Sequence, residues 1–236
     1  MNISLIIPAH NEEKYLPGCL ESVAPHAERL LEVIVVDNAS TDHTAKVAGW
    51  FPFARVVHEP RKGLLWARQR GFLESRGDHL AYMDADCRMP PAWVDIVERE
   101  FGAARELAAL SGPARYYDLP RFKKLAGEAG WWLSAPLAYR AVGYTLWGGN
   151  FVVSRSALAK IGGFNTGISF YGEDMDLARR LAPVGKVRFM MSFYAFTSGR
   201  RISQAGLVRT FSTYGVNFLW EVLFGKPFTK NHDNHR

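Results

Sequence analysis

The chain has 236 residues, of which 48% are hydrophobic and 22% charged, so its composition is that of a globular protein and excludes a disordered one. The formal net charge of +6 favours a phosphate-bearing partner, such as a nucleotide, nucleic acid or an anionic membrane. The basic residues are scattered, so we expect no nucleic-acid binding. Cys19 and Cys87 form no CxxC pair, and the N-terminus shows no secretory signal pattern, which favours a cytoplasmic location without disulfides.

Short apolar runs alternate with helical patterns over the first hundred residues. The runs are bounded by polar residues, proline or glycine and lack strict alternation, as expected of strands that are buried on both faces. The predicted strands are Ile3–Ile7, Val33–Val36, Ala54–His58 and Leu80–Met83, and the predicted helices are Glu12–Val23, Asp42–Phe51 and Leu64–Ser75. This order predicts an α/β fold with a doubly wound, mostly parallel mixed sheet and helices on both faces.

The pattern becomes less regular after a helix predicted at Trp93–Phe101. Residues 119–147 are rich in aromatic side chains but contain Pro136 and several glycines, so we interpret them as a partly helical insertion. We then expect a strand at Asn150–Ser154, a helix at Glu173–Leu181 and a strand near Lys186–Met190. We expect the chain to divide into an α/β half (1–115), a second half of the same domain (116–198) and a C-terminal amphipathic helical tail (199–236).

The tail contains apolar residues at helical spacing from Gln204 to Phe224. Arg209 and Glu221 interrupt the run, which therefore falls short of the roughly 20 apolar residues of a membrane-spanning helix. Two interpretations stay open. The segment is either a helix packed on the domain, or a helix at the inner face of a membrane, assisted by cations that include Arg200 and Arg201.

Polar clusters follow the first, second and fourth predicted strands. In a doubly wound sheet the carboxyl ends of parallel strands meet at one edge, where ligands bind. Asp84 and Asp86 follow the fourth strand, and such paired carboxylates suit Mg²⁺ or Mn²⁺, which complete their coordination with water and substrate phosphates. The alternative for this pair is a solvated acidic turn.

Other charged residues fall near the same edge. Asp37 could accept a hydrogen bond from a nucleobase or cap the next helix. Glu12 could bind ribose hydroxyls or stabilise a helix start. Lys62 and Arg68 could face a nucleotide or its phosphates, or belong to a solvated basic helix face.

A separate acidic cluster, Gly172-Glu173-Asp174, stands at a predicted helix start. Carboxylates are favoured in the first turn by the helix dipole, which is the structural explanation. The functional one is that Asp174 or Glu173 is a general base that deprotonates an acceptor hydroxyl.

Taken together, six motifs in this order resemble those of the family 2 glycosyltransferases of GT-A fold. They are Ile7-Pro8-Ala9-His10-Asn11-Glu12-Glu13, Val36-Asp37-Asn38-Ala39-Ser40-Thr41-Asp42, Lys62-Gly63 with Ala67-Arg68, Asp84-Ala85-Asp86, Gly148-Gly149-Asn150 and Gly172-Glu173-Asp174. The resemblance implies inverting transfer from a nucleotide-diphosphate sugar to a hydroxyl acceptor, assisted by Mg²⁺ or Mn²⁺.

The resemblance also implies roles for individual residues. Ala9, Asp37 and Arg68 would contact the nucleobase, and Glu12 would contact the ribose. Asp86 would be the principal metal ligand, with Asp84 at the metal or ribose. Gly149 and Asn150 would border the donor sugar. Asp174 would act as the general base and Glu173 would position the acceptor, although these two could exchange roles.

Two departures from the family pattern narrow the expected activity. Asn38 stands where many relatives carry a second acid. Gln204-Ala205-Gly206-Leu207 lacks the Arg-Trp of processive polymerases, so we expect transfer of a single sugar to a glycan or lipid-linked intermediate of the cell envelope. The alternatives are a catalytically silent nucleotide-sugar binding module and a sugar nucleotidyltransferase, although the Gly-rich loop of the latter is missing after the first strand.

Overall fold

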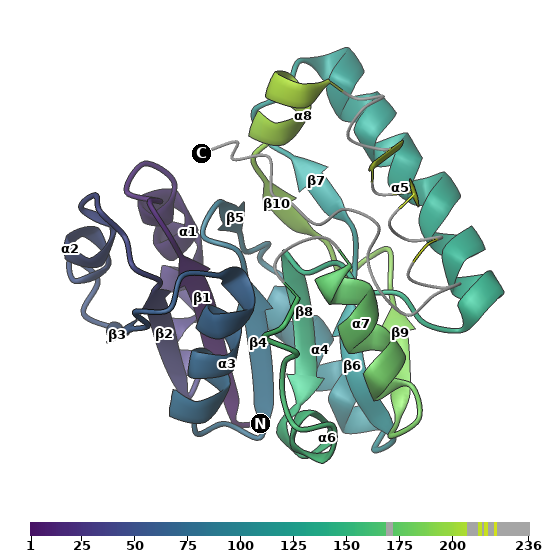
Figure 1. Ribbon diagram of the computed structural model, residues 1–236, viewed down its shortest axis with the longest axis horizontal. Helices are drawn as coiled ribbons and strands as arrows, with labels where there is room; N and C mark the ends of the chain where they lie inside the picture. Colours follow the sequence, from purple (N-terminus) through teal and green to yellow (C-terminus); the bar gives the residue numbers. More distant parts are fainter. Residues whose placement is uncertain (169–171, 207–211, 214, 217–219, 221–236) are drawn as a thin grey trace.

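A seven-stranded mixed sheet forms the centre of the computed structural model, which describes residues 1–168, 172–206, 212–213, 215–216 and 220 (Figure 1). The strand order is β3-β2-β1-β4-β8-β6-β9. Strand β8 runs antiparallel to both of its neighbours, and the other pairs are parallel, so the predicted mixed sheet is confirmed. The strands are β1 (Ile3–Ala9), β2 (Glu32–Asp37), β3 (Ala54–His58), β4 (His79–Met83), β6 (Leu107–Ser111), β8 (Asn150–Ser154) and β9 (Lys186–Phe189).

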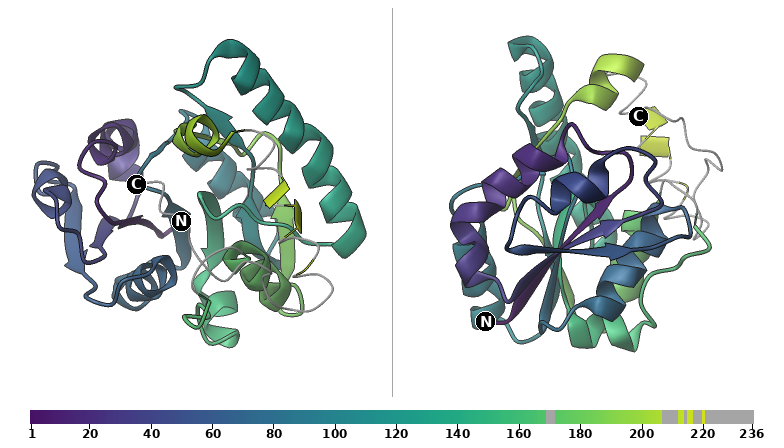
Figure 2. Two further views of the ribbon diagram at one scale, coloured as in Figure 1. Left: turned by 45° about the horizontal axis from the view of Figure 1, so that its top comes forward. Right: turned by 90° about the vertical axis from the view of Figure 1, so that its left-hand side faces the viewer.

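Helices cover both faces of this sheet (Figure 2). They are α1 (Leu16–Val23), a 3-10 turn at Ala24–Arg29, α2 (Thr44–Ala48), α3 (Leu64–Glu74), α4 (Trp93–Ala103), α5 (Arg121–Val142), α6 (Arg155–Lys160), α7 (Glu173–Leu181) and α8 (Arg200–Ala205).

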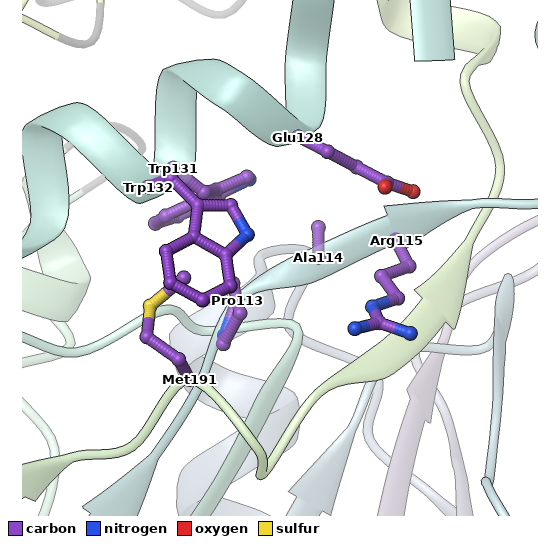
Figure 3. A pocket seen from close by; sticks show the side chains of 7 residues that line it. All are labelled: Pro113, Ala114, Arg115, Glu128, Trp131, Trp132 and Met191. Carbon is purple, nitrogen blue, oxygen red and sulfur yellow. The ribbon is translucent and has the colours of Figure 1, made fainter. Parts of the chain in front are cut away.

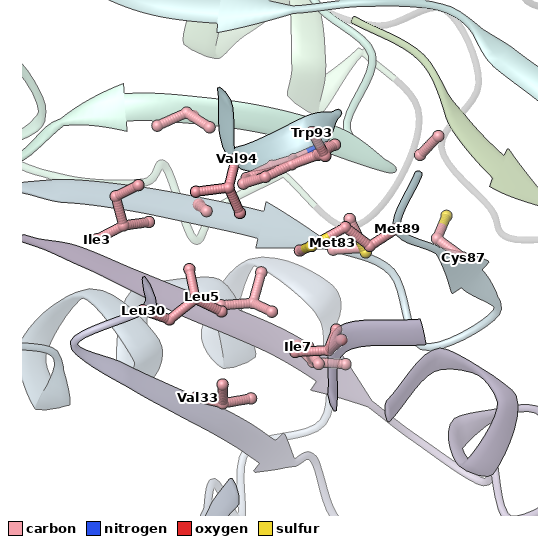
Figure 4. Close-up of a cluster of buried hydrophobic side chains, with 14 of the residues drawn as sticks. Ile3, Leu5, Ile7, Leu30, Val33, Met83, Cys87, Met89, Trp93 and Val94 are labelled. Carbon is pink, nitrogen blue, oxygen red and sulfur yellow. The ribbon is translucent and has the colours of Figure 1, made fainter. Parts of the chain in front are cut away.

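Two apolar cores lie on opposite sides of the sheet because successive side chains of a strand point to opposite faces. Leu5 and Ile7 enter the core that contains Trp93 of α4, part of which is shown in Figure 4. Ile6 enters the other core, with Leu177 of α7. Each strand is therefore held from both sides, which fixes where its carboxyl end lies.

The first two helices are shorter than predicted. Helix α1 begins at Leu16 instead of Glu12, with Pro17 in the first turn, where its missing N–H costs no hydrogen bond. Helix α2 covers Thr44–Ala48 only. The Asp42 carboxylate accepts the Thr44 N–H at 2.9 Å where this helix begins.

The aromatic-rich insertion is a regular element, so our interpretation of residues 119–147 as only partly helical was wrong. Helix α5 runs for 22 residues without a break. Gly127 allows close packing, because a Cβ there would lie 2.8 Å from the Tyr116 ring, and Pro136 faces solvent. The helix ends at Gly143, whose φ of 77° suits a glycine.

A small second sheet, which the sequence did not predict, consists of β5 (Cys87–Arg88), β10 (Ala195–Thr197) and β7 (Ala114–Tyr116). Cys87 pairs with Thr197 in this sheet. Since β5 directly follows Asp86 and β10 directly precedes Ser198–Arg200, the pairing carries the start of α8 back to the acidic edge. The predicted division at residue 115 falls within β7 and stays a prediction.

The end of the chain is described only in part. Most of the helix predicted from Gln204 to Phe224 lies outside the described residues. Where the structure does describe the chain, no helix combines the length and the apolar character needed to cross a bilayer.

Candidate functional site

The loops after β1 and β2 lie side by side and are joined by hydrogen bonds. The Glu12 N–H donates to Thr44 Oγ1 at 2.8 Å, and the Glu13 N–H donates to Asp42 Oδ2 at 3.2 Å. In the opposite direction, the Thr41 N–H donates to Asn11 Oδ1 at 2.8 Å. The predicted meeting of the polar clusters at one edge is thus confirmed for these two loops, which together form one wall.

Asp37 and Asn38 organise the base of this wall. Asp37 is 6% exposed, with Oδ1 accepting the Ser40 N–H and Oδ2 lying 3.1 Å from His58 Nδ1. The Asn38 amide donates to the carbonyls of Glu59 and Arg61 and accepts the Gly63 N–H at 2.8 Å. A carboxylate could not donate to those carbonyls, which explains why an amide stands at position 38.

Ala9 and Lys62 belong to the same region. Ala9 is buried at the end of β1, and its carbonyl accepts the Asn38 N–H at 2.8 Å. Lys62 is exposed on the loop that Asn38 holds. Ala9 and the loop of Lys62 are thus joined to Asn38, the neighbour of Asp37, and the assignment of both residues to nucleotide binding stays a prediction.

Asp86 is held by a cation from the far end of the chain. Arg200 Nη2 lies 3.1 Å from Asp86 Oδ2 and 2.6 Å from Glu12 Oε1, and Arg200 Nη1 lies 3.0 Å from Glu12 Oε2. The Tyr15 ring packs on the same guanidinium, 4.6 Å from its carbon. Burial raises the pKa of Asp86 to about 7, and Asp84 and Glu12 add to the effect while Arg200 opposes it.

Arg200 therefore does not support the membrane interpretation of the tail, in which it was one of the assisting cations. Its side chain is only 21% exposed and is directed at two carboxylates of the site. Sequence reasoning missed this role because the partners lie far apart in the chain. The unpredicted β5–β10 pairing is the feature that brings them together.

A second cation, Arg68, lies between Asp84 and Asp174. It is 1% exposed, and its Nη2 lies 3.7 Å from Asp84 Oδ1 while its Nη1 lies 3.4 Å from Asp174 Oδ1. Burial alone would lower the pKa of Arg68, but Asp174 and Asp84 raise it above its ordinary value. The guanidinium thus stays charged and keeps the cluster after β4 beside the start of α7.

Asp174 is fixed on its other side by the backbone. Its Oδ2 accepts the Gly148 N–H at 2.7 Å, and Arg68 Nη2 donates to the Gly148 carbonyl at 2.9 Å. A Cβ at Gly148 would overlap the ends of the Asp174 and Arg68 side chains, so a larger residue there would displace them. Asp174 therefore has a defined orientation, as a group that reacts in one geometry needs.

The two carboxylates at the start of α7 favour protonation more than ordinary ones. Burial, with Asp174 as a nearby like charge, raises the pKa of Glu173 to about 7. Burial likewise raises the pKa of Asp174, while Arg68 and the Gly148 N–H oppose the rise. Raised carboxylate pKa values of this kind mark candidate proton acceptors.

The start of β8 contributes an asparagine, and the residue before it is a glycine, Gly149. The Asn150 side chain is fully buried, accepts the Trp93 Nε1–H at 2.8 Å and donates to the Phe193 carbonyl at 2.9 Å. Both ends of this amide are therefore hydrogen-bonded to groups of the protein itself. At the same point the Gly149 carbonyl accepts the Asp84 N–H at 3.3 Å, which ties the segment to the acidic edge.

A family model described as glycosyl transferase family 2 matches residues 4–162. The chain belongs to glycosyl transferase family 2. A second model, described as the N-terminal domain of galactosyltransferase, matches residues 133–197, which include the segments that hold Asp174.

Curated family members are similar to part of the chain. The dolichol-phosphate mannosyltransferase of Pyrococcus furiosus is 34% identical over 121 residues, which cover 49% of this chain and 34% of that protein. The glycosyltransferase AglE of Haloferax volcanii is 33% identical over 100 residues, 39% of this chain and 33% of that protein. The chain thus matches about a third of the length of these relatives.

Solved structures share the GT-A fold. The mannosyltransferase PcManGT of Pyrobaculum calidifontis, in complex with GDP-Man and Mn²⁺, has a TM-score of 0.71 at 20% identity, covering 94% of this chain and 64% of that one. Glucosyl-3-phosphoglycerate synthase of Mycobacterium tuberculosis, with Mn²⁺, UDP-Glc and phosphoglyceric acid, has a TM-score of 0.69 at 22% identity, covering 97% and 81%.

The residues of this family 2 member fit a divalent cation. Within the described ranges, no group of three His, Cys, Asp or Glu side chains could by itself enclose a metal. Mg²⁺ and Mn²⁺ do not need such a group, because they retain water and use substrate phosphates as ligands. Asp86, which is buried, and the more exposed Asp84 are the carboxylates that could supply the protein share of such a shell.

Proposed function

We propose that the chain transfers a single sugar from a nucleotide-diphosphate sugar to a hydroxyl acceptor, with inversion at the anomeric carbon. The observation that carries the proposal is the pair of contacts made by Arg68, at 3.7 Å to Asp84 and 3.4 Å to Asp174. These contacts put a candidate base next to the residues that would hold the metal and the diphosphate. A single displacement needs the general base and the leaving diphosphate to lie close together, one on each side of the reacting carbon.

In the proposed step Asp174 accepts the proton of the acceptor hydroxyl. The acceptor oxygen then forms a bond to the anomeric carbon as the bond between that carbon and the diphosphate oxygen breaks. Attack from the side opposite the leaving group inverts the configuration. Glu173, the neighbouring carboxylate, positions the acceptor or exchanges roles with Asp174.

Mg²⁺ or Mn²⁺ held by Asp86 and Asp84 would neutralise the charge that builds up on the departing nucleoside diphosphate. On the nucleotide side, Asp37 would accept from the base, with Ala9 and Lys62 beside it. Glu12 is paired with Arg200, so a ribose bound by Glu12 would share its carboxylate with the guanidinium. The backbone at Gly149 would border the donor sugar, since the Asn150 amide is bonded elsewhere.

The acceptor is proposed to be a glycan or lipid-linked intermediate. Support for a lipid comes from the similarity to a dolichol-phosphate mannosyltransferase. A stripe of exposed apolar side chains along α5 adds to it; these are Phe122, Leu125, Leu133 and Leu137, 59–70% exposed. Contact of residues 204–224 with a membrane stays a prediction, and flotation with anionic vesicles tests it, since equal and negligible binding by the full chain and a chain ending at Arg201 would refute it.

The decisive test is a panel of UDP- and GDP-sugars, assayed for turnover with and without Mn²⁺. Asp86→Ala should remove the metal-dependent turnover. Asp95→Ala is the matched control, because Asp95 is a surface carboxylate with a 62% exposed side chain. A nucleotide-sugar that stabilises the folded chain but is never turned over would favour the silent binding module instead.

A further inference from the structure

The outer side of helix α5 is a stripe of exposed apolar side chains, which we call the outer stripe. Its five large members are 59–70% exposed and recur at helical spacing, so they share one face of the helix. They are Phe122, Leu125, Trp132, Leu133 and Leu137. Ala129, in the middle of the same face, is exposed as well. From its first to its last large side chain the stripe is roughly 22 Å long.

Exposed apolar surface is concentrated on this helix. In the described part of the chain eleven large apolar side chains are exposed, and five of them lie on α5. The other six come from six separate segments of the chain. Single exposed apolar side chains are normal, whereas a contiguous apolar face marks an interaction surface. The outer stripe is therefore a candidate for contact with a partner.

The inner side of α5 is attached to the domain. Glu128 and Trp131 line the narrow space between α5 and β7 (Figure 3). The Trp131 ring stacks on Phe189 of β9, with ring centres 6.0 Å apart. Nearer the end of the helix, the Tyr139 hydroxyl donates to the Val187 carbonyl at 3.1 Å. These contacts fix the rotation of the helix and leave the outer stripe on the surface.

The charges of α5 indicate what kind of partner the stripe fits. The helix contains four basic residues and one acidic residue. Arg121 and Lys123 lie at the N-terminal end of the stripe, and Arg140 lies at its C-terminal end. Two copies of this helix face to face, whether parallel or antiparallel, would bring these cations together, which disfavours a second copy. An anionic lipid surface attracts cations at both ends and accepts the apolar side chains between them.

We propose that the outer stripe of α5 is a docking surface for a bilayer that contains anionic lipids. The helix lies in the plane of the headgroups and does not cross the bilayer, since no described helix is long and apolar enough to do so. This surface is distinct from residues 204–224. It goes beyond the proposed function, because vesicle binding requires neither a nucleotide-sugar nor a metal.

Docking through α5 would also have a consequence for the reaction site. The rings of Trp131 and Trp147 have centres 6.0 Å apart. Trp147 directly precedes Gly148, whose N–H binds Asp174. The helix that meets the bilayer therefore contacts the segment that orients the candidate base, which suits an acceptor carried by a lipid.

The first test places an environment-sensitive dye on the outer stripe of the full chain. Cys19 and Cys87 are both buried, so a surface cysteine is labelled selectively. Ala129→Cys carries an NBD group in the middle of the stripe, and Ala103→Cys carries it on an exposed alanine at the end of α4 as the matched control. With vesicles of equal parts phosphatidylcholine and phosphatidylglycerol, emission of the label at position 129 should shift to shorter wavelength, and emission of the label at position 103 should not.

Point variants in the full chain measure what the stripe and its cations contribute to co-sedimentation with these vesicles. Leu133→Asp should weaken binding about tenfold, because it removes an apolar contact and adds a negative charge at an anionic surface. Leu73→Asp is the matched control, since Leu73 is 67% exposed on α3 and Leu133 is 70% exposed. Arg140→Gln should weaken binding about fivefold, and it should have little effect with phosphatidylcholine alone.

Equal binding by Leu133→Asp and Leu73→Asp would overturn the proposal. If the chain binds vesicles while the label at position 129 does not shift, another segment such as residues 204–224 makes the contact, and the proposal for α5 fails. A dimer in solution that already shields this label without lipid would assign the stripe to a second copy, which also overturns it.

Discussion

The acidic edge of the sheet and helix α5 differ in how far their side chains are buried and paired within the protein. At the edge, Glu12 and Arg68 are 3% and 1% exposed and have fixed partners. On α5, Leu133 and Leu137 are 70% and 66% exposed. Groups that must act in one geometry are preorganised at the edge, whereas α5 keeps apolar surface for a partner.

The largest effect is expected when the charge of the candidate general base at the acidic edge is removed. Asp174→Asn keeps the size of the side chain but cannot accept a proton, so transfer should fall by roughly 10²–10⁴-fold while nucleotide-sugar binding persists. Steady-state turnover and a thermal-shift titration measure the two quantities. Transfer at the native rate would remove Asp174 from the mechanism.

The pH profile of the same reaction separates Asp174 from Glu173. The pair titrates as a unit, and with the pKa of Glu173 raised to about 7 the rate should increase with pH through that range. If Asp174 is the base, Glu173→Gln removes a like charge and should move the rising limb to lower pH. A complete loss of rate in Glu173→Gln would assign the base to Glu173 instead.

Removal of the buried cation should produce the largest loss of stability. Arg68→Met leaves Asp84 and Asp174 without the guanidinium between them, and because their side chains are 38% and 26% exposed the loss should be about 1–3 kcal/mol. The free energy of unfolding, from urea titration, measures the effect. Arg70→Met on the same helix is the control, because Arg70 is a 40% exposed partner of Glu74 and should cost little.

A smaller effect is expected from the second cation of the edge. Arg200 lies between Asp86 and Glu12, and a divalent cation at Asp86 would compete with it. Arg200→Gln should therefore bind Mn²⁺ more tightly in the absence of nucleotide, by about tenfold, which corresponds to ~1.4 kcal/mol. Calorimetric titration measures this, and Arg29→Gln controls for the change in net charge. Weaker Mn²⁺ binding would show that Arg200 supports the metal site instead.

The smallest effect is expected on the exposed face of α5. Leu133→Ser changes an exposed side chain without a described partner in the core, so the free energy of unfolding should change by less than about 0.5 kcal/mol. Urea unfolding of the isolated protein checks it. A larger loss would show that another part of the chain covers this face, and the contrast between the two regions would disappear.

The sequence predicted the elements whose signal is local. Strand β3 has the predicted bounds, and β1, β2 and β4 differ from theirs by at most two residues at an end. Continuous apolar runs closed by Asp37 and Asp84 carry that signal within a few residues. The grouping of polar residues at one edge followed from the parallel topology alone.

What could not be predicted depends on contacts between distant residues. Gly127 suggested a break in a helix, whereas its purpose is close packing against Tyr116. Strands β5, β7 and β10 have only two or three residues, too few for a periodic pattern. The pairing of Arg200 with Glu12 joins residues that are 188 positions apart, and no feature near either one indicates it.

That pairing also orders events during synthesis of the protein. Protein domains begin to fold from the N-terminus as the ribosome makes them, and Glu12 and Asp86 are made long before Arg200. The nascent sheet must therefore keep two close carboxylates apart until the guanidinium arrives, with water or a free cation in its place.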